Sequence, residues 1–350
     1  MRIAVLCPPW IPVPPTGYGG IEWVVSLLVE ELVARGHDVT LFASGGSRTK
    51  AELISVFDEA PMGDMHRNVP DARHAARAFR EILARAGTPR SFDVMHDHSA
   101  CIALAAAPAL PVPVVHTLHG AFTHEMKEFY AGVAVGVTFV AISKVQRDDM
   151  PSLPVSKIVP NSVDVESFPF APAKGDYLLC LGRITRDKGQ DVAVSVAKRT
   201  GVPLVLAGKI DPGADQQFFD EAILPHIDGQ LVRFEGEVPD ERKKELLAGA
   251  RAALFPIRWQ EPFGLVMVEA MSCGTPVIAN GWGAVPEVVT DGVTGFITQD
   301  EDGMVAALGR LDEIDPARCR ADALARFSPA GMADAYERVY AEAVAAFKRG

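Results

Sequence analysis

Short apolar runs and longer amphipathic stretches alternate along the first half of the chain. Residues 2–7 form an apolar run, which is typical of a strand buried on both faces. Residues 19–35 carry their apolar side chains at helical spacing, and Gly36 follows as a helix stop. The same reasoning predicts a helix over 72–86 and the strands 39–43, 53–57, 94–96, 112–117, 137–142 and 157–160.

The pattern is interrupted at residues 164–176, which contain Pro169 and Pro172, show little periodicity and therefore fit a linker. The alternation then starts again. It predicts the strands 177–181, 203–207, 231–234, 252–255 and 276–279, the helices 190–199, 215–224, 240–248 and 264–272, and a last helix over 329–348.

Two runs of alternating strands and helices indicate an α/β protein with two parallel sheets, each covered by helices. We expect an N-terminal domain over residues 1–165 and a C-terminal domain over 175–328. The last helix, 329–348, can pack back on the N-terminal domain or close on the other one. Ligands of such sheets bind outside the carboxyl ends of the strands, so two facing domains would form a binding cleft between those ends.

Composition narrows the class of protein. The 350 residues suffice for two domains of roughly 150–180 residues each, and 48% apolar and 23% charged residues are typical of a globular chain. The formal net charge of −11 argues against a nucleic-acid partner, because the phosphate backbone would be repelled. The five cysteines form no C-x-x-C pair, which is typical of reduced thiols in a cytoplasmic protein.

Signals for export or membrane insertion are weak. Residues 1–10 lack the long apolar core of a signal peptide, and the longest uncharged apolar stretch, 101–115, is too short to span a bilayer. We therefore expect a cytoplasmic protein. The helix 72–86 combines arginines with apolar residues, so weak peripheral contact with anionic lipid is an alternative to a solvated arginine-rich face. The sequence does not indicate the oligomeric state.

A glycine-rich loop, with Gly17, Gly19 and Gly20, separates the first strand from the first helix. Glycines let the backbone approach a ligand closely, and the following helix start offers free N–H groups to an anion. A dinucleotide site does not fit, because the spacing is G-x-G-G and the second strand ends without an acidic residue for a ribose. An ordinary strand-to-helix turn remains the alternative.

A second loop, with the sequence GRITRDKG, follows the first strand of the second half and carries Arg183 and Lys188. Two cations at the carboxyl end of a strand suit a diphosphate, because arginine offers forked hydrogen bonds and lysine a point charge. A solvated loop with incidental charges is the alternative.

The most specific motif, EPFGLVMVEAMSCGTP, places Glu261 in a loop and Glu269 inside the helix that follows. Apolar residues surround Glu269 on nearly all sides, so the helix is expected to be buried and the carboxylate to need partners. The start of this helix can direct its free amides at a phosphate while Glu269 reaches a neighbouring hydroxyl pair.

Taken together, these motifs resemble glycosyltransferase family 4, a family of retaining glycosyltransferases with the GT-B fold. The resemblance covers nearly the whole chain and also includes the segments ELVARGHDVTLFA (31–43) and PNSVD (160–164). It implies two Rossmann-like parallel-sheet domains that face each other across a cleft. The donor would be a nucleotide-activated sugar held mainly by the C-terminal domain, and the acceptor would be read by the N-terminal domain.

The resemblance also implies roles for individual residues. His119, after the fifth N-terminal strand, matches the active-site histidine of the family. Arg183 and Lys188 would bind the donor diphosphate, and Glu261 would contact the transferred sugar. The remaining residues implied in donor binding are Gly19, Gly20, Gly182, Val238, Phe263, Gly264, Leu265 and Glu269.

The implied reaction is transfer of a sugar to an acceptor hydroxyl with retained anomeric configuration. Positive groups and helix amides would stabilise the negative charge that develops on the leaving diphosphate. No carboxylate nucleophile stands out, so departure and attack on one face are favoured over a covalent intermediate. The expected donor is UDP-linked, with glucose favoured and ADP- and GDP-sugars left open. The acceptor can be a saccharide, a lipid-linked glycan or a natural product, since a fold does not determine its substrate.

Three alternatives remain at this point. A GT-B epimerase or a phosphorylase would use the same cleft, and a non-catalytic protein would bind the nucleotide sugar without turnover. The histidines at 96, 98, 116, 119 and 124 raise zinc as a further alternative, but no cysteine joins them at ligand spacing. The D-x-D triplet 300–302 opens an expected surface helix, where acidic residues suit the helix dipole. We expect neither a metal nor a cofactor, the nucleotide sugar being a co-substrate.

Two departures from the family pattern leave contacts open. The family often carries a Gly-Gly-x-Pro-Glu turn where this chain has NGWGAVPE at 280–287. The loop before Glu261 carries the bulky residues Arg258, Trp259 and Gln260, which can shape the sugar pocket or only pack.

Overall fold

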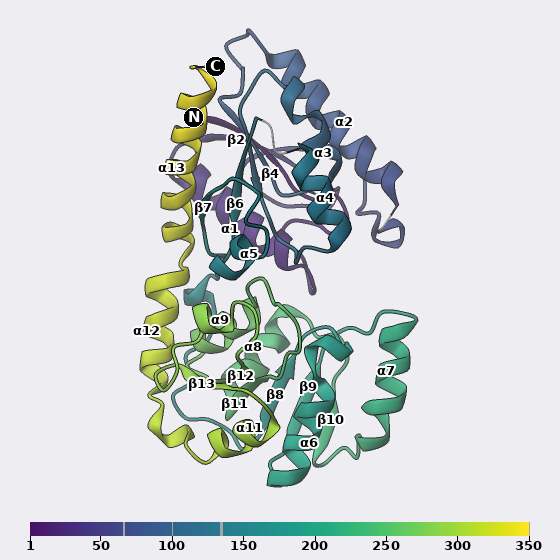
Figure 1. Cartoon of the computed structure of the whole chain (residues 1–350), viewed down its shortest axis with the longest axis vertical. Coiled ribbons are helices and arrows are strands. Elements are labelled where there is room, and N and C mark those ends of the chain that lie inside the picture. The colour runs from purple at the N-terminus through teal and green to yellow at the C-terminus, as the bar shows by residue number, and fades with distance from the viewer. Residues whose placement is uncertain (66, 100, 134–135, 350) are drawn as a thin grey trace. The chain divides into compact units, whose positions relative to one another are not determined.

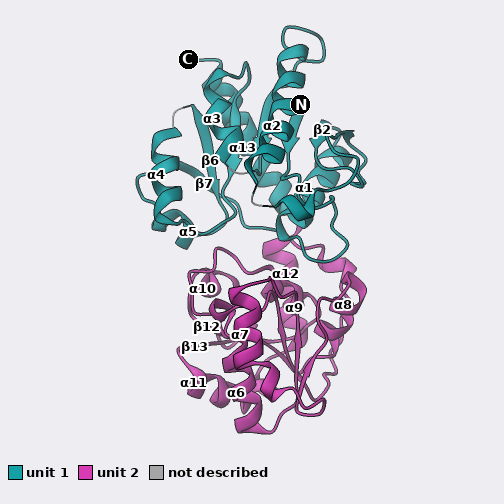
Figure 2. Cartoon of the chain, turned by 90° about the vertical axis from the view of Figure 1, so that its right-hand side faces the viewer, with its two compact units in different colours: residues 1–162, 329–350 teal, residues 163–328 magenta. Residues whose placement is uncertain are grey.

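The structure is a computed structural model that describes residues 1–65, 67–99, 101–133 and 136–349. It divides into two compact units, which Figure 2 shows in separate colours. Unit 1 consists of Met1–Ser162 and Pro329–Gly350, and unit 2 consists of Val163–Ser328. Unit 1 is therefore built from two separate pieces of the sequence.

Unit 1 contains one parallel sheet of seven strands in the order β3-β2-β1-β4-β5-β6-β7. Its strands are β1 (Arg2–Leu6), β2 (Asp38–Phe42), β3 (Glu52–Ile54), β4 (Val94–Asp97), β5 (Val114–Thr117), β6 (Val137–Ala141) and β7 (Val155–Ile158). Its helices are α1 (Gly20–Ala34), α2 (Asn68–Arg85), α3 (Cys101–Ala106), α4 (His124–Val133), α5 (Lys144–Asp149) and α13 (Pro329–Phe347).

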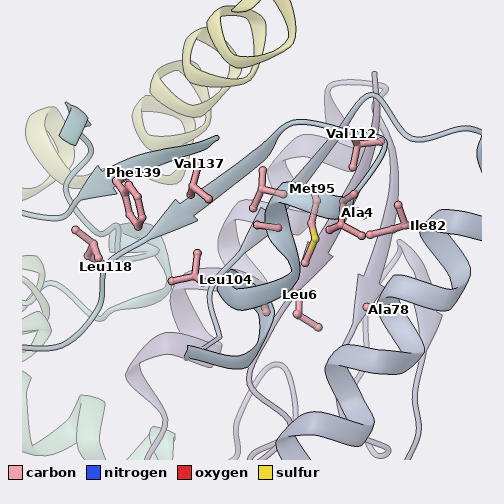
Figure 3. Packing of buried hydrophobic residues seen from close by; sticks show 14 of the residues in the cluster. Ala4, Leu6, Ala78, Ile82, Met95, Leu104, Val112, Leu118, Val137 and Phe139 are labelled. Carbon is pink, nitrogen blue, oxygen red and sulfur yellow. The ribbon is translucent and has the colours of Figure 1, made fainter. Parts of the chain in front are cut away.

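One face of this sheet packs on α2, α3 and α4. The cluster in Figure 3 joins Leu6 and Met95 of the sheet to Ile82 of α2 and Leu104 of α3, and all four side chains are buried. Because side chains alternate along a strand, the residue after Met95 points to the opposite face. That residue is His96, and its Nδ1 lies 2.7 Å from the hydroxyl of Tyr340 in α13.

The C-terminal helix α13, yellow in Figure 1, completes unit 1. It packs against α1, β4 and β5. Its residues Tyr336 and Tyr340 are buried, and the hydroxyl of Tyr336 lies 2.8 Å from Oγ1 of Thr117 in β5. At the other side of the helix, Arg35 forms ion pairs with Asp334 and Glu337. The helix is thus anchored by both apolar burial and polar contacts.

Unit 2 contains a parallel sheet of six strands in the order β10-β9-β8-β11-β12-β13. Its strands are β8 (Leu178–Leu181), β9 (Leu204–Ala207), β10 (Val232–Phe234), β11 (Ala252–Phe255), β12 (Val277–Asn280) and β13 (Gly295–Thr298). Its helices are α6 (Gln190–Thr200), α7 (Ala214–Ala222), α8 (Asp240–Gly249), α9 (Leu265–Ser272), α10 (Val285–Val288), α11 (Glu301–Leu308) and α12 (Pro316–Phe327).

The strand order places a topological switch point in each sheet. In unit 1 the chain runs outward from β1 to β3 and then returns to pair β4 with the other edge of β1. In unit 2 it runs from β8 to β10 and returns to pair β11 with β8. Ligands of open parallel sheets bind where the loops after two such strands diverge. The loops after β1 and β4, and those after β8 and β11, are therefore the places to search.

Several elements differ from the sequence-based expectation. Residues 164–176, expected as a linker, lie in unit 2, where Ala171 donates a backbone hydrogen bond to Cys273 and Gly175 donates one to Gly249. The strand expected at 53–57 is shorter, at Glu52–Ile54, and the short strand β13 was not expected. Within the described residues, no helix is both long and apolar enough to cross a membrane.

Candidate functional site

The switch point of unit 2 brings two of the predicted site residues together. Lys188 ends a short 3-10 helix (Arg186–Lys188) in the loop after β8, and Thr185 caps that helix by accepting from the Lys188 N–H at 3.2 Å. Glu261 lies in the loop after β11. The ammonium of Lys188 and the carboxylate of Glu261 form an ion pair, and only 23% and 10% of their side chains are exposed. The sequence predicted separate roles for these residues and did not predict this pairing.

Aromatic side chains enclose the ion pair. The Lys188 ammonium lies 5.2 Å from the centre of the Trp259 ring and 5.5 Å from that of Phe255, both within the range of cation–π attraction. The indole N–H of Trp259 donates to Oε2 of Glu261 at 3.1 Å. Trp259, whose role the sequence left open, therefore contacts both charges. It orients the carboxylate and covers the ammonium.

The turn at 280–287 supports the Glu261 loop from behind. The Ala284 N–H donates to the backbone carbonyl of Glu261 at 2.8 Å, and the Gly283 N–H donates to the Gln260 side chain at 3.1 Å. A Cβ on Gly283 would lie 2.3 Å from the Glu261 nitrogen, and Gly283 has a φ of +57°, so only glycine fits without a shift. The chain thus makes close contacts at the turn where it departs from the family pattern.

Arg183 occupies the same loop as Lys188 but has different partners. Its guanidinium lies 3.2 Å from Asp211 and 3.7 Å from Asp215. Asp211 follows β9, so Arg183 is held on the β9 side of β8 while Lys188 is held on the β11 side. Gly182, directly before Arg183, has a φ of +146°, which favours glycine, and its carbonyl oxygen lies so close to Gly208 that a Cβ on Gly208 would be 1.9 Å from it.

The helix α9 begins beside Glu261. Gly264, in the left-handed region at φ +87°, precedes its first residue, Leu265. The first amides of a helix have no partner within the helix and can accept an anion. Phe263 is buried edge-to-face against Phe327, with ring centres 5.6 Å apart, and this contact fixes the approach to the helix.

Glu269 has the partner that its buried surroundings demand. Its Oε1 lies 2.7 Å from the ammonium of Lys243 in α8, which also contacts Asp240 at 3.1 Å. Burial alone would lower the pKa of Lys243, but the two carboxylates outweigh it and raise the pKa. Val238 lies two residues before α8, in the loop after β10, and is half-buried.

In unit 1, Gly19 and Gly20 stand at the start of α1 and His119 follows β5, as predicted. A chain of hydrogen bonds leads from His119 into the interior. Nε2 of His119 lies 2.8 Å from Nδ1 of His98, and Nε2 of His98 lies 3.2 Å from Nδ1 of His96. Burial lowers the pKa of His96 and of His98, and burial together with His116 lowers the pKa of His119 to about 3. All three rings of the chain are therefore neutral near pH 7.

The hydrogen positions in this chain follow from Tyr340. Its buried hydroxyl has one partner among the described residues, Nδ1 of His96, so its hydrogen is satisfied only by donating there. Nδ1 of His96 then carries no hydrogen, and the hydrogen of the next contact comes from Nε2 of His98. Since His98 is neutral, its Nδ1 accepts from Nε2 of His119. His119 is thereby left with an unprotonated Nδ1.

A fourth histidine, His116, belongs to a separate group of polar side chains with Asp97 and Ser99. Nδ1 of His116 lies 2.7 Å from Asp97, whose other oxygen accepts from the backbone and hydroxyl of Ser99. Over the described residues, no three side chains of the metal-binding types are grouped so that they could hold an ion. In the D-x-D triplet, Asp300 caps α11 by accepting from the Gly303 N–H at 2.9 Å.

A cavity of about 350 Å³ opens beside His119 at the switch point of unit 1. Its walls come from the loop after β1, the start of α1, the start of α2 and the ends of β4 and β5. Two carboxyl side chains line it, Glu22 of α1 and Asp71 of α2. Burial raises the pKa of Glu22 to about 7, and burial together with Asp97 raises that of Asp71 to about 6.

Two family models match the chain. Residues 18–167 match the family described as Glycosyltransferase Family 4, and residues 165–320 match that described as Glycosyl transferases group 1. A phosphatidyl-myo-inositol mannosyltransferase of Mycolicibacterium smegmatis is 30% identical over 348 residues, which cover 91% of this chain and 86% of that protein. The chain belongs to glycosyltransferase family 4.

Solved structures share this fold. A glycosyltransferase involved in avilamycin A biosynthesis is 28% identical, with a TM-score of 0.74 and coverage of 99% of this chain and 98% of its own. An Anabaena protein solved in complex with UDP and glucose is 19% identical, with a TM-score of 0.76 and coverage of 98% and 100%. The prediction of a family 4 glycosyltransferase built from two Rossmann-like parallel-sheet domains is confirmed.

Three residues in the candidate sites of this family 4 glycosyltransferase were not assigned a role from the sequence. Trp259 was noted without a role, and Glu22 and Asp71 were missed. Glu22 could have been found, because it stands three and seven residues before the buried Val25 and Val29 and so lies on the apolar stripe of α1. A carboxylate on such a stripe needs either a partner or a ligand.

Proposed function

We propose that this family 4 glycosyltransferase transfers a sugar from a UDP-linked donor to an acceptor hydroxyl with retention of anomeric configuration. The ion pair between Lys188 and Glu261 at the switch point of unit 2 carries the proposal. It puts a positive group for a diphosphate and a hydrogen-bond acceptor for sugar hydroxyls side by side, where a parallel sheet binds ligands.

The donor would meet both groups. Its diphosphate takes the ammonium of Lys188 and the free amides at the start of α9, which together stabilise the charge that develops as the glycosidic bond breaks. Glu261, held by the Trp259 indole, accepts from hydroxyls of the sugar. Arg183 would exchange Asp211 for a phosphate oxygen, and Glu269 would accept from the ribose while Lys243 keeps it oriented.

The identity of the nucleotide rests on fold likeness. The Anabaena protein that shares this fold was solved with UDP and glucose, so we favour UDP-glucose. We further propose that no metal ion is needed, because Lys188 and the helix amides supply the positive charge. His119, neutral and with an unprotonated Nδ1, would accept a hydrogen bond from a substrate hydroxyl and not act as an acid.

Calorimetric titration of the protein with UDP-, ADP- and GDP-glucose in EDTA tests the donor assignment. We expect UDP-glucose to bind more tightly than the other two. With an acceptor present, NMR of the initial product should show the anomeric configuration of the donor. Binding without turnover toward any acceptor would favour a nucleotide-sugar binding protein, and formation of sugar 1-phosphate from a glycoside and added inorganic phosphate would favour a phosphorylase. Release of UDP together with an epimer of the donor sugar, and no glycosylated acceptor, would favour an epimerase.

A further inference from the structure

The cavity of unit 1 has the features of a preformed binding site. It encloses about 350 Å³ next to His119, a volume suited to one or two sugar rings. Trp10 and Ile11 of the loop after β1, Met126 and Tyr130 of α4, and the two carboxyls of Glu22 and Asp71 face it. Apolar and aromatic walls with a few convergent polar groups are typical of small-molecule sites.

Glu22 is a buried carboxyl that lines the cavity. The residue is 5% exposed, so its carboxyl lies almost entirely out of bulk water. No side chain among the described residues forms a hydrogen bond or an ion pair with its carboxyl, and only its own backbone N–H opposes the rise of its pKa. A buried carboxyl whose oxygens accept too few hydrogen bonds costs free energy unless a ligand donates the missing ones. The cavity in front of Glu22 gives access for such a partner.

Positive charge is absent from the described lining. No lysine or arginine is among those residues, and of the three histidines, His98 and His119 have lowered pKa values while His116 is held by Asp97. A phosphate group in this cavity would lose its hydration without a cation in return and would face two carboxyls. A neutral polyol would meet acceptors for its hydroxyls and aromatic rings for its C–H faces.

We propose that this cavity binds the acceptor substrate and that the acceptor is a polyol without a phosphate group at the bound end, with Glu22 and Asp71 accepting from its hydroxyls. The assignment rests on the proposed transfer function. It goes further by separating unphosphorylated acceptors, such as free sugars and cyclitols, from their phosphate esters. It also makes Glu22 a residue that determines specificity.

Matched pairs of ligands test the proposal. Myo-inositol and glucose are compared with myo-inositol 3-phosphate and glucose 1-phosphate, using saturation-transfer NMR for binding and UDP release from UDP-glucose for turnover. We expect each free polyol to bind at least 10-fold more tightly than its phosphate ester. The Glu22→Gln variant keeps the shape of the side chain and should weaken polyol binding at least fivefold, whereas Glu59→Gln, on an exposed loop residue, should not.

The outcomes are separable. Tighter binding of the esters, no binding of any polyol, or equal polyol affinity in Glu22→Gln and wild type would each overturn the proposal. Binding of UDP is followed in parallel by thermal shift, because its candidate site lies in unit 2. UDP binding without polyol binding would reject the acceptor assignment and leave the proposed function standing. Polyol binding that depends on Glu22, in a protein that ignores every nucleotide sugar, would reject the proposed function alone.

Discussion

Lys188 and Glu261 come from loops that follow adjacent strands, β8 and β11, and neutralise each other at the carboxyl edge of the sheet. Both charges are largely withdrawn from water, so separating them without a replacement would be costly. A diphosphate supplies that replacement for Lys188. Under the proposed function, donor binding therefore exchanges one ion pair for another and leaves Glu261 available to sugar hydroxyls.

Replacing Lys188 by alanine tests this exchange. We expect Lys188→Ala to lose donor affinity and to reduce turnover about 100-fold, because the developing charge on the leaving group is no longer met. The matched control is Lys198→Ala: Lys198 lies in α6, and its ammonium is 2.8 Å from Nδ1 of His226, away from the loops after β8 and β11. Calorimetry with UDP and initial rates provide the measurement. Full activity in Lys188→Ala would remove its phosphate role.

The indole of Trp259 should matter through its N–H. Trp259→Phe keeps an aromatic ring near Lys188 but removes the donor to Glu261, so we expect kcat to fall about 10-fold with little change in the free energy of unfolding. Trp282→Phe, at an exposed position of the supporting turn, is the control and should retain activity. Equal rates for the two variants would show that the Trp259 N–H does not orient the carboxylate.

Gly283 should tolerate no side chain. Gly283→Ala would press a methyl group against the Glu261 backbone at a left-handed φ, so we expect a loss of about 1–3 kcal/mol in unfolding free energy and a displaced Glu261 loop. Gly87→Ala, at a left-handed φ of +72° where a Cβ meets nothing within 4 Å, is the matched control, because it shares the φ but not the close contact. Chemical denaturation and activity of both variants decide the point, and a fully active, equally stable Gly283→Ala would contradict it.

Stability should depend on pH through Glu22. Its folded-state pKa, about 7, lies above the ordinary value of 4.5, so the protonated form stabilises the fold below pH 4.5 and that stability is lost as the pH rises toward 7. Glu22→Gln imitates the protonated form and should be more stable than wild type by about 2–3 kcal/mol at pH 8, with a much smaller difference near pH 5. Calorimetric unfolding at both pH values measures this, and a pH-independent difference would contradict it.

Tyr340 is expected to act as a positioning residue for His119. Tyr340→Phe removes the donor that fixes the ring hydrogens, so we expect imidazole ¹⁵N NMR to show His119 shifting from a single Nε2–H tautomer to a mixture of both. Tyr336→Phe makes the same change on the same helix but leaves Nδ1 of His96 with its donor, and should keep one tautomer. One tautomer in both variants would show that the chain of hydrogen bonds does not transmit the effect.

The fold was largely predictable because parallel strands buried on both faces give continuous apolar runs. Residues 2–7 and 252–255 illustrate this, and β1 and β11 lie at those places. The strand β13, also of four residues, escaped notice because its sequence GFIT has only two large apolar residues between a glycine and a threonine and so gives no apolar run. Its place as a strand depends on pairing with β12 and not on its own sequence.

Motifs in the sequence pointed to individual residues of the candidate site, but not to the ion pairs between them. Motif spacing located Lys188, Glu261 and Glu269, yet it did not reveal that Glu261 pairs with Lys188 or that Lys243 pairs with Glu269. These partners are separated by 26 to 73 positions and meet only because the strand order brings their loops together. Contacts of this kind depend on topology, which a local pattern does not contain.

Unit 1 cannot be completed until α13 has been synthesised. Its first 162 residues are synthesised well before α13, and all of unit 2 is made in between. During translation the hydroxyl partners of His96 and Thr117 are missing, and the sheet face that α13 covers stays open to solvent. In ribosome-bound nascent chains unit 2 should therefore be able to fold before unit 1, which should become protected from proteolysis only after α13 has emerged.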